Sequence, residues 1–88
     1  MKTTKYDLEQ FIYHHIVDEY NVHPATVSKD AKLQDELGID SLDKVEISCD
    51  IEKKFSVTLD DEAIDNATTF GELVDAAFSS FQNTEDEN

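Results

Sequence analysis

Apolar residues recur at helical spacing in the last third of the chain, and this pattern constrains the fold more than any other feature. The 88 residues include only 2 Gly and 1 Pro, so few positions interrupt a helix. Thr69 and Glu72 fit a capping box, which predicts a helix beginning at Thr68 or Thr69. Six apolar residues then follow one helical face: Phe70, Leu73, Val74, Ala77, Phe78 and Phe81.

Three more helices are predicted upstream of this one. Residues 41–55 form the second helix. Its start at Ser41 is signalled by Gly38 and then by Asp40 and Ser41, both good N-terminal capping residues. Residues 60–66 form a short third helix, because an acidic first turn suits a helix N-terminus. Residues 7–20 form the first helix, whose apolar face carries Leu8, Phe11, Ile12, His15 and Ile16.

The segments between these helices are predicted to be loops. Residues 21–38 form a long ordered loop, which should contain a short helical turn because structureless loops of this length are unusual in compact domains. Residues 56–59 form an extended connection. The predicted fold is all-α, a small antiparallel bundle of three longer helices and one short helix. Residues 1–81 form its single domain, and residues 82–88 form an acidic tail that we expect to be disordered.

The charge balance excludes several classes of function. Seven Lys and no Arg stand against 21 acidic residues, a formal net charge of −14. Nucleic acids and anionic membranes require clustered cations, so neither is an expected partner. No thiolate zinc site or internal disulfide is available to a single Cys, and no metal site is predicted. Without a secretory signal or an apolar run long enough to span a membrane, the expected location is the cytoplasm.

The predicted second helix carries two apolar stripes instead of one. Ile47, Ile51 and Phe55 form one stripe, and the other lies on roughly the opposite side of the helix. Either both stripes are buried between helices, or one is exposed as a docking face. The second stripe consists of Leu42, Val45 and Cys49, and the carboxylates of Asp43, Glu46 and Asp50 flank it.

Ser41 is the residue with the clearest chemical potential. It stands at a predicted helix N-terminus, where unpaired N–H groups and the helix dipole favour a phosphate group. The local pattern alone favours the simpler interpretation, in which the Ser41 hydroxyl serves only as the helix cap. A hydrolase triad is not indicated, because the sequence has no Gly-x-Ser-x-Gly elbow.

Residues 35–42, Asp-Glu-Leu-Gly-Ile-Asp-Ser-Leu, resemble the phosphopantetheine-attachment motif of acyl carrier proteins, whose core reads Leu-Gly-x-Asp-Ser-Leu. The resemblance extends over residues 7–80. It implies that Ser41 receives 4′-phosphopantetheine from coenzyme A through a separate phosphopantetheinyl transferase, and that Asp40 assists this transfer. The chain would then be a carrier, not an enzyme. It would hold acyl groups as thioesters, most naturally in fatty acid or related lipid and polyketide biosynthesis.

The resemblance also implies which surface meets partner enzymes. Glu46 would contact their basic patches, with Asp43 and Glu52 as helpers, and the chain would act as a monomer. The expected apolar docking contacts are Leu42, Val45 and Cys49. The alternative function is an acidic helical interaction module that shares the bundle but is never modified.

Overall fold

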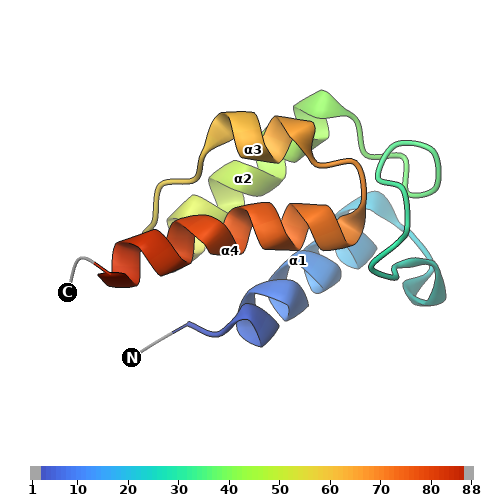
Figure 1. The fold of residues 1–88 in the computed structure, drawn as a ribbon. Coiled ribbons are helices and arrows are strands. Elements are labelled where there is room, and N and C mark those ends of the chain that lie inside the picture. The colour runs from blue at the N-terminus through green and yellow to red at the C-terminus, as the bar shows by residue number, and fades with distance from the viewer. Residues whose placement is uncertain (1–2, 87–88) are drawn as a thin grey trace.

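The computed structural model describes the backbone of residues 3–86 and the side chains of residues 3–81. It confirms the predicted all-α fold, and its described part contains no strand (Figure 1). The predicted tail, residues 82–88, lies outside the residues whose side chains are described. No helix in the described part is both long and apolar enough to cross a membrane. The helices are α1 (Lys5–Tyr20), the 3-10 helix η1 (Pro24–Thr26), α2 (Ser41–Phe55), α3 (Asp61–Asn66) and α4 (Phe70–Asp86).

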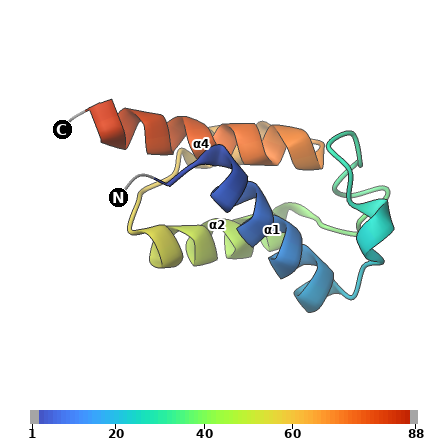
Figure 2. The same ribbon diagram turned by 90° about the horizontal axis from the view of Figure 1, so that it is seen from below.

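The long loop between α1 and α2 lies at one end of the bundle, and both α2 and α4 begin at this end (Figures 1 and 2). The predicted helical turn in this loop is η1. Backbone hydrogen bonds fasten the loop to the start of α4. The N–H of Leu33 donates to Thr68 O at 2.9 Å, and the N–H of Phe70 donates to Ala31 O at 2.9 Å. The loop that leads into α2 is therefore fastened to the start of α4.

One continuous core holds the helices together. The faces predicted for α1 and α4 point into it, and Leu33, Leu37 and Ile39 add loop side chains. Burial of this apolar area is the main stabilising term for the fold. The largest fully buried side chains are Leu8, Ile12, Ile16, Leu33, Ile39, Ile47, Ile51 and Leu73.

The helix starts differ in detail from those predicted. α1 begins at Lys5 because Thr4 and Asp7 form a capping box that the sequence analysis missed. The predicted box of α4 is half right: Glu72 N donates to Thr69 Oγ1 at 3.2 Å, but the Glu72 carboxylate accepts from Thr68 N and Oγ1, both at 2.8 Å. These hydrogen bonds, led by the Thr68 backbone bond, lower the pKa of Glu72.

Candidate functional site

Ser41 is the first residue of α2, but it is not the cap of this helix. Asp40 is the N-cap: its Oδ1 accepts from Asp43 N at 3.0 Å, and Asp43 Oδ2 accepts in return from Asp40 N at 3.2 Å. This reciprocal pair is a capping box. The cap is therefore complete without the serine, which removes the interpretation of Ser41 as a capping residue only.

The Ser41 side chain is exposed and uncommitted. It is exposed to solvent and makes no hydrogen bond to any residue that the structure describes. The loop before it explains this position. Gly38 adopts a left-handed conformation with φ of 70°, which a side chain would strain. Ile39 then turns inward, 1% exposed, and its N–H donates to Leu33 O at 2.7 Å. Asp40 and Ser41 consequently face solvent.

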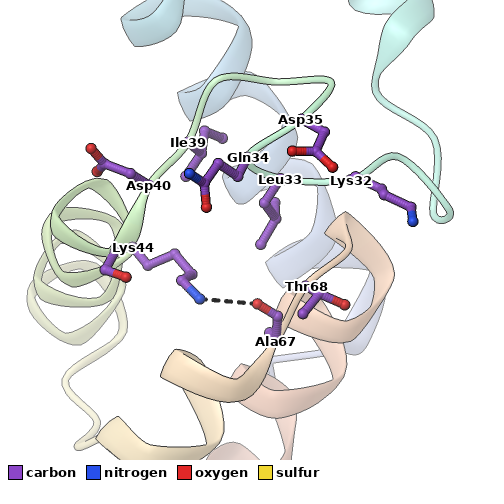
Figure 3. A pocket seen from close by; sticks show the side chains of 10 residues that line it. Lys32, Leu33, Gln34, Asp35, Ile39, Asp40, Lys44, Ala67 and Thr68 are labelled. Carbon is purple, nitrogen blue, oxygen red and sulfur yellow. Dashed lines mark hydrogen bonds between the residues drawn. The ribbon is translucent and has the colours of Figure 1, made fainter.

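Two cavities flank Ser41. The loop cavity, about 370 Å³, lies between the residue 32–40 segment, the start of α2 and the α3–α4 connection (Figure 3). The helix cavity, about 270 Å³, lies between α2 and α3 and is lined by Ser41, Lys44, Val45, Ser48, Asp61, Ile64 and Asp65. Only Ser41 and Lys44 line both cavities. A group attached to Ser41 therefore has recesses on either side of its point of attachment.

Lys44 is the principal site residue that the sequence analysis missed. Its side chain is 8% exposed, and its ammonium donates to Asp65 O at 2.7 Å and to Ala67 O at 3.0 Å. Figure 3 shows it reaching from α2 to the segment after α3. A signal was available, because Lys44 stands three positions before Ile47 and seven before Ile51, on the buried stripe of the helix.

The two apolar stripes of α2 are not equally buried. Ile47 and Ile51 are fully buried, whereas Leu42 is 79% exposed and Val45 is 59% exposed. Cys49 on the same stripe is exposed as well. The alternative in which both stripes are buried is therefore wrong. The exposed stripe, Leu42, Val45 and Cys49, begins directly beside Ser41.

The three carboxylates predicted to help docking are each held by the fold. Asp43 belongs to the capping box of α2. Glu52 Oε2 accepts from Leu59 N at 2.8 Å, which fixes the α2–α3 connection. Glu46 Oε1 accepts from the Tyr20 hydroxyl at 3.0 Å. Desolvation, this hydrogen bond and the negative charges on α2 raise the pKa of Tyr20. A docking role for these carboxylates stays a prediction.

No metal site emerges among the residues that the structure describes, where no cluster of three or more His, Cys, Asp or Glu is placed to hold an ion. Between α1 and α2, His15 Nε2 lies 3.3 Å from Asp50 Oδ2, as a pair and not as a cluster.

Comparison with known proteins gives a consistent result. The family model described as "Phosphopantetheine attachment site" matches residues 10–77. The acyl carrier protein of Wolinella succinogenes is 37% identical over 59 residues, 67% of this chain and 78% of that protein. That of Thermotoga maritima is 39% identical over 59 residues, 67% and 73% of the two chains. That of Chlorobium phaeobacteroides is 31% identical over 72 residues, 82% and 92% of the two chains.

The helical fold, the attachment-site match and the relatives define a small carrier domain that bears a covalent 4′-phosphopantetheine group. More particularly, the chain belongs to the acyl carrier protein family. The described residues fit such a group. Ser41 offers an exposed, uncommitted hydroxyl, and the N–H groups of Ser41 and Leu42 in the first turn of α2 have no acceptor among the described residues. An attached phosphate is favoured at such a helix end.

Proposed function

We propose that Ser41 is the residue that carries the phosphopantetheine arm, and that the chain shuttles acyl groups between enzymes without catalysing a reaction itself. The single observation that carries the proposal is the exposed Ser41 hydroxyl, left uncommitted because Asp40 caps the helix. The attachment motif at residues 37–42 and the attachment-site match support it.

The attachment step is a transfer performed by a separate enzyme. The Ser41 oxygen forms a bond to the phosphorus of coenzyme A that bears the pantetheine, the phosphoanhydride bond breaks, and adenosine 3′,5′-bisphosphate leaves while the serine proton is released. Asp40 directly precedes Ser41 in the chain, and its second carboxylate oxygen accepts no hydrogen bond from the described residues. Asp40 therefore can help to hold the transferase's magnesium ion. The terminal thiol of the bound arm holds acyl groups as thioesters.

Delivery to partner enzymes would use the exposed stripe and its acidic flank. Leu42 and Val45 offer apolar contact beside the arm, and Glu46 offers a negative charge that the Tyr20 hydroxyl keeps in place. With a net charge of −14, partners with basic surfaces would be steered to the carrier without tight binding. We propose that it acts as a monomer in the cytoplasm, in fatty acid biosynthesis or a related lipid or polyketide pathway.

Intact-mass measurement tests this proposal. Purified apo protein is incubated with coenzyme A and a phosphopantetheinyl transferase, and a gain of one phosphopantetheine group is expected. Ser41→Ala should abolish the gain completely. Ser79→Ala is the matched control, because Ser79 is exposed on α4 far along the chain from the motif, and this variant should be modified normally.

Modification of Ser41→Ala at another residue would contradict the assignment of the site. Absence of modification in the native chain with several transferases would instead favour the unmodified interaction module. In that case Glu46→Lys would still weaken binding to a basic partner, while Ser41→Ala would leave binding unchanged.

A further inference from the structure

Lys44 is a buried cation that has no carboxylate partner in the described part of the chain. Its side chain is 8% exposed, and lysines buried to this extent are usually paired with a negative charge. Lys44 instead donates to two neutral groups, the carbonyls of Asp65 and Ala67, and forms no ion pair with a described residue. These carbonyls lie at the end of α3, where the helix dipole offsets only part of a positive charge. An anion beside Lys44 would compensate the rest and would accept from its third N–H.

The position of Lys44 on α2 indicates which anion this is. Lys44 stands three positions after Ser41, and residues at this spacing are neighbours on a helix surface. Both residues line the loop cavity and the helix cavity. Lys32 also lines the loop cavity, but it is exposed, and Figure 3 shows its side chain directed away from Lys44. A phosphodiester on the Ser41 oxygen would carry a negative charge within one helical turn of the buried ammonium.

The other charges around Ser41 make this pairing more valuable. The carboxylates that line the two cavities are Asp35, Asp40, Asp61 and Asp65. They repel a phosphate group. The free N–H groups in the first turn of α2 attract it, but they carry only partial charges. Among the residues that the structure describes, Lys44 is the single full positive charge that lines both cavities.

We infer that Lys44 is the counter-ion of the phosphodiester that joins the arm to Ser41, and that it positions this phosphate against the bundle. The inference rests on the proposed attachment at Ser41. The third N–H of Lys44 donates to a phosphate oxygen, while Asp65 and Ala67 keep the other two. Because the buried charge is compensated only after attachment, the loaded carrier is more stable than the unloaded one. Lys44 is a positioning residue, since it neither reacts nor carries the acyl group.

The test separates the charge of Lys44 from its hydrogen bonds. Lys44→Gln removes the charge but retains an amide N–H₂ group that can donate to carbonyls. Lys53→Gln is the matched control, because it removes the same charge from an exposed position of α2. Each chain is measured unloaded and after loading from coenzyme A by a phosphopantetheinyl transferase, and intact mass verifies the purified loaded form. The loaded native chain should melt about 4–8 °C above the unloaded one, the shift that one net hydrogen bond gives to a domain of this size.

Lys44→Gln should lose most of this gain, because only the helix N-terminus then attracts the phosphate, whereas Lys53→Gln and Lys32→Gln should keep it. The gain is a difference within each variant, so a general loss of stability does not affect it. Phosphorus NMR gives a second readout that a merely structural role would not move. The phosphodiester resonance should shift in Lys44→Gln, return toward its native position in Lys44→Arg and stay unchanged in Lys53→Gln.

Absence of a gain in the native chain, an equal gain in Lys44→Gln or an unshifted phosphorus resonance in that variant would overturn the inference. Loss of the gain in Lys32→Gln but not in Lys44→Gln would also overturn it, because the counter-ion would then lie on the loop. Failure of the native chain to gain the mass of the arm would instead contradict the proposed function. The mass measurement therefore distinguishes the two kinds of failure.

Discussion

The two sides of α2 differ in where their apolar and polar residues lie. The exposed stripe consists of Leu42, Val45 and Cys49, which are apolar side chains in solvent. The buried side contains Ile47 and Ile51 but also two polar residues, Lys44 and Ser48. Apolar residues thus lie on the outside where a partner is expected, and two polar residues lie on the inside beside the cavities that flank Ser41, the proposed attachment site. Exposed apolar residues and buried polar residues are both unusual, and in α2 both kinds lie next to the candidate site.

The difference also shows how α2 is held. The buried side is fixed by packing and by the hydrogen bonds of Lys44 to the segment after α3. On the exposed side, Glu46 at the edge of the stripe accepts a hydrogen bond from the Tyr20 hydroxyl on α1. The helix that begins at Ser41 is therefore held on two sides, while the exposed stripe beside Ser41 remains accessible.

The largest effect should separate the two stripes. Ile51→Ala removes a fully buried side chain and should lower the free energy of unfolding by about 2–5 kcal/mol. Val45→Ala, at a position 59% exposed, should change it by no more than about 0.5 kcal/mol. Urea denaturation followed by circular dichroism measures both values. Similar losses in the two variants would mean that Val45 is packed in solution, and the exposed stripe would then not be a docking face.

A smaller effect should show what the buried lysine contributes. Lys44→Met keeps a side chain of similar length but leaves the carbonyls of Asp65 and Ala67 without their donor, at a cost of about 1–3 kcal/mol. Lys53→Met removes the same charge from an exposed position of α2 and should cost at most about 0.5 kcal/mol. Chemical denaturation at neutral pH measures both. Equal losses would show that net charge alone, and not the buried contacts, explains the effect.

Most of the fold could be predicted from the sequence because its helices obey a simple period. The bounds of α2 were predicted correctly, and the apolar face of α4 is the one observed. The caps were less predictable, since several residues near each start could accept the same N–H groups. The pattern predicted that the Glu72 carboxylate would accept from Thr69. It accepts from Thr68 instead, because the connection before α4 places Thr68 within reach.

Only those residues of the candidate site that are neighbours in the sequence could be predicted. Ser41 and Asp40 lie next to each other in the chain, so a short motif was enough to identify them. The roles of Lys44 and Tyr20 depend on contacts with residues 21 to 26 positions away, which no local pattern reveals. The spacing of the apolar residues also predicted two stripes on α2, but it could not show which of them faces the bundle. That choice depends on how the loop and α3 pack around the helix.

The smallest predicted effect concerns the link between the exposed side of α2 and α1. Burial and the Glu46 hydrogen bond raise the pKa of Tyr20 above its ordinary value of 10.0, so the folded protein keeps this proton after the unfolded chain has lost it. The stabilising contribution is fully present below about pH 10 and is lost as the pH rises above it. Tyr20→Phe should cost less than about 1 kcal/mol at neutral pH. It should also remove part of the alkaline decline in the free energy of unfolding, as measured by urea denaturation between neutral and alkaline pH.

Tyr6→Phe is the matched control for this last measurement, because Tyr6 is 67% exposed and lies on the same helix. It should leave the alkaline decline unchanged. If Tyr20→Phe declined as steeply as the native chain, the Tyr20–Glu46 hydrogen bond would not persist in solution. Glu46 would then be a mobile surface charge, and the acidic flank would lack the fixed geometry that sets it apart from the rest of an acidic surface. Only the buried side of α2 would then be held in place, and the two sides of the helix would differ more than the structure indicates.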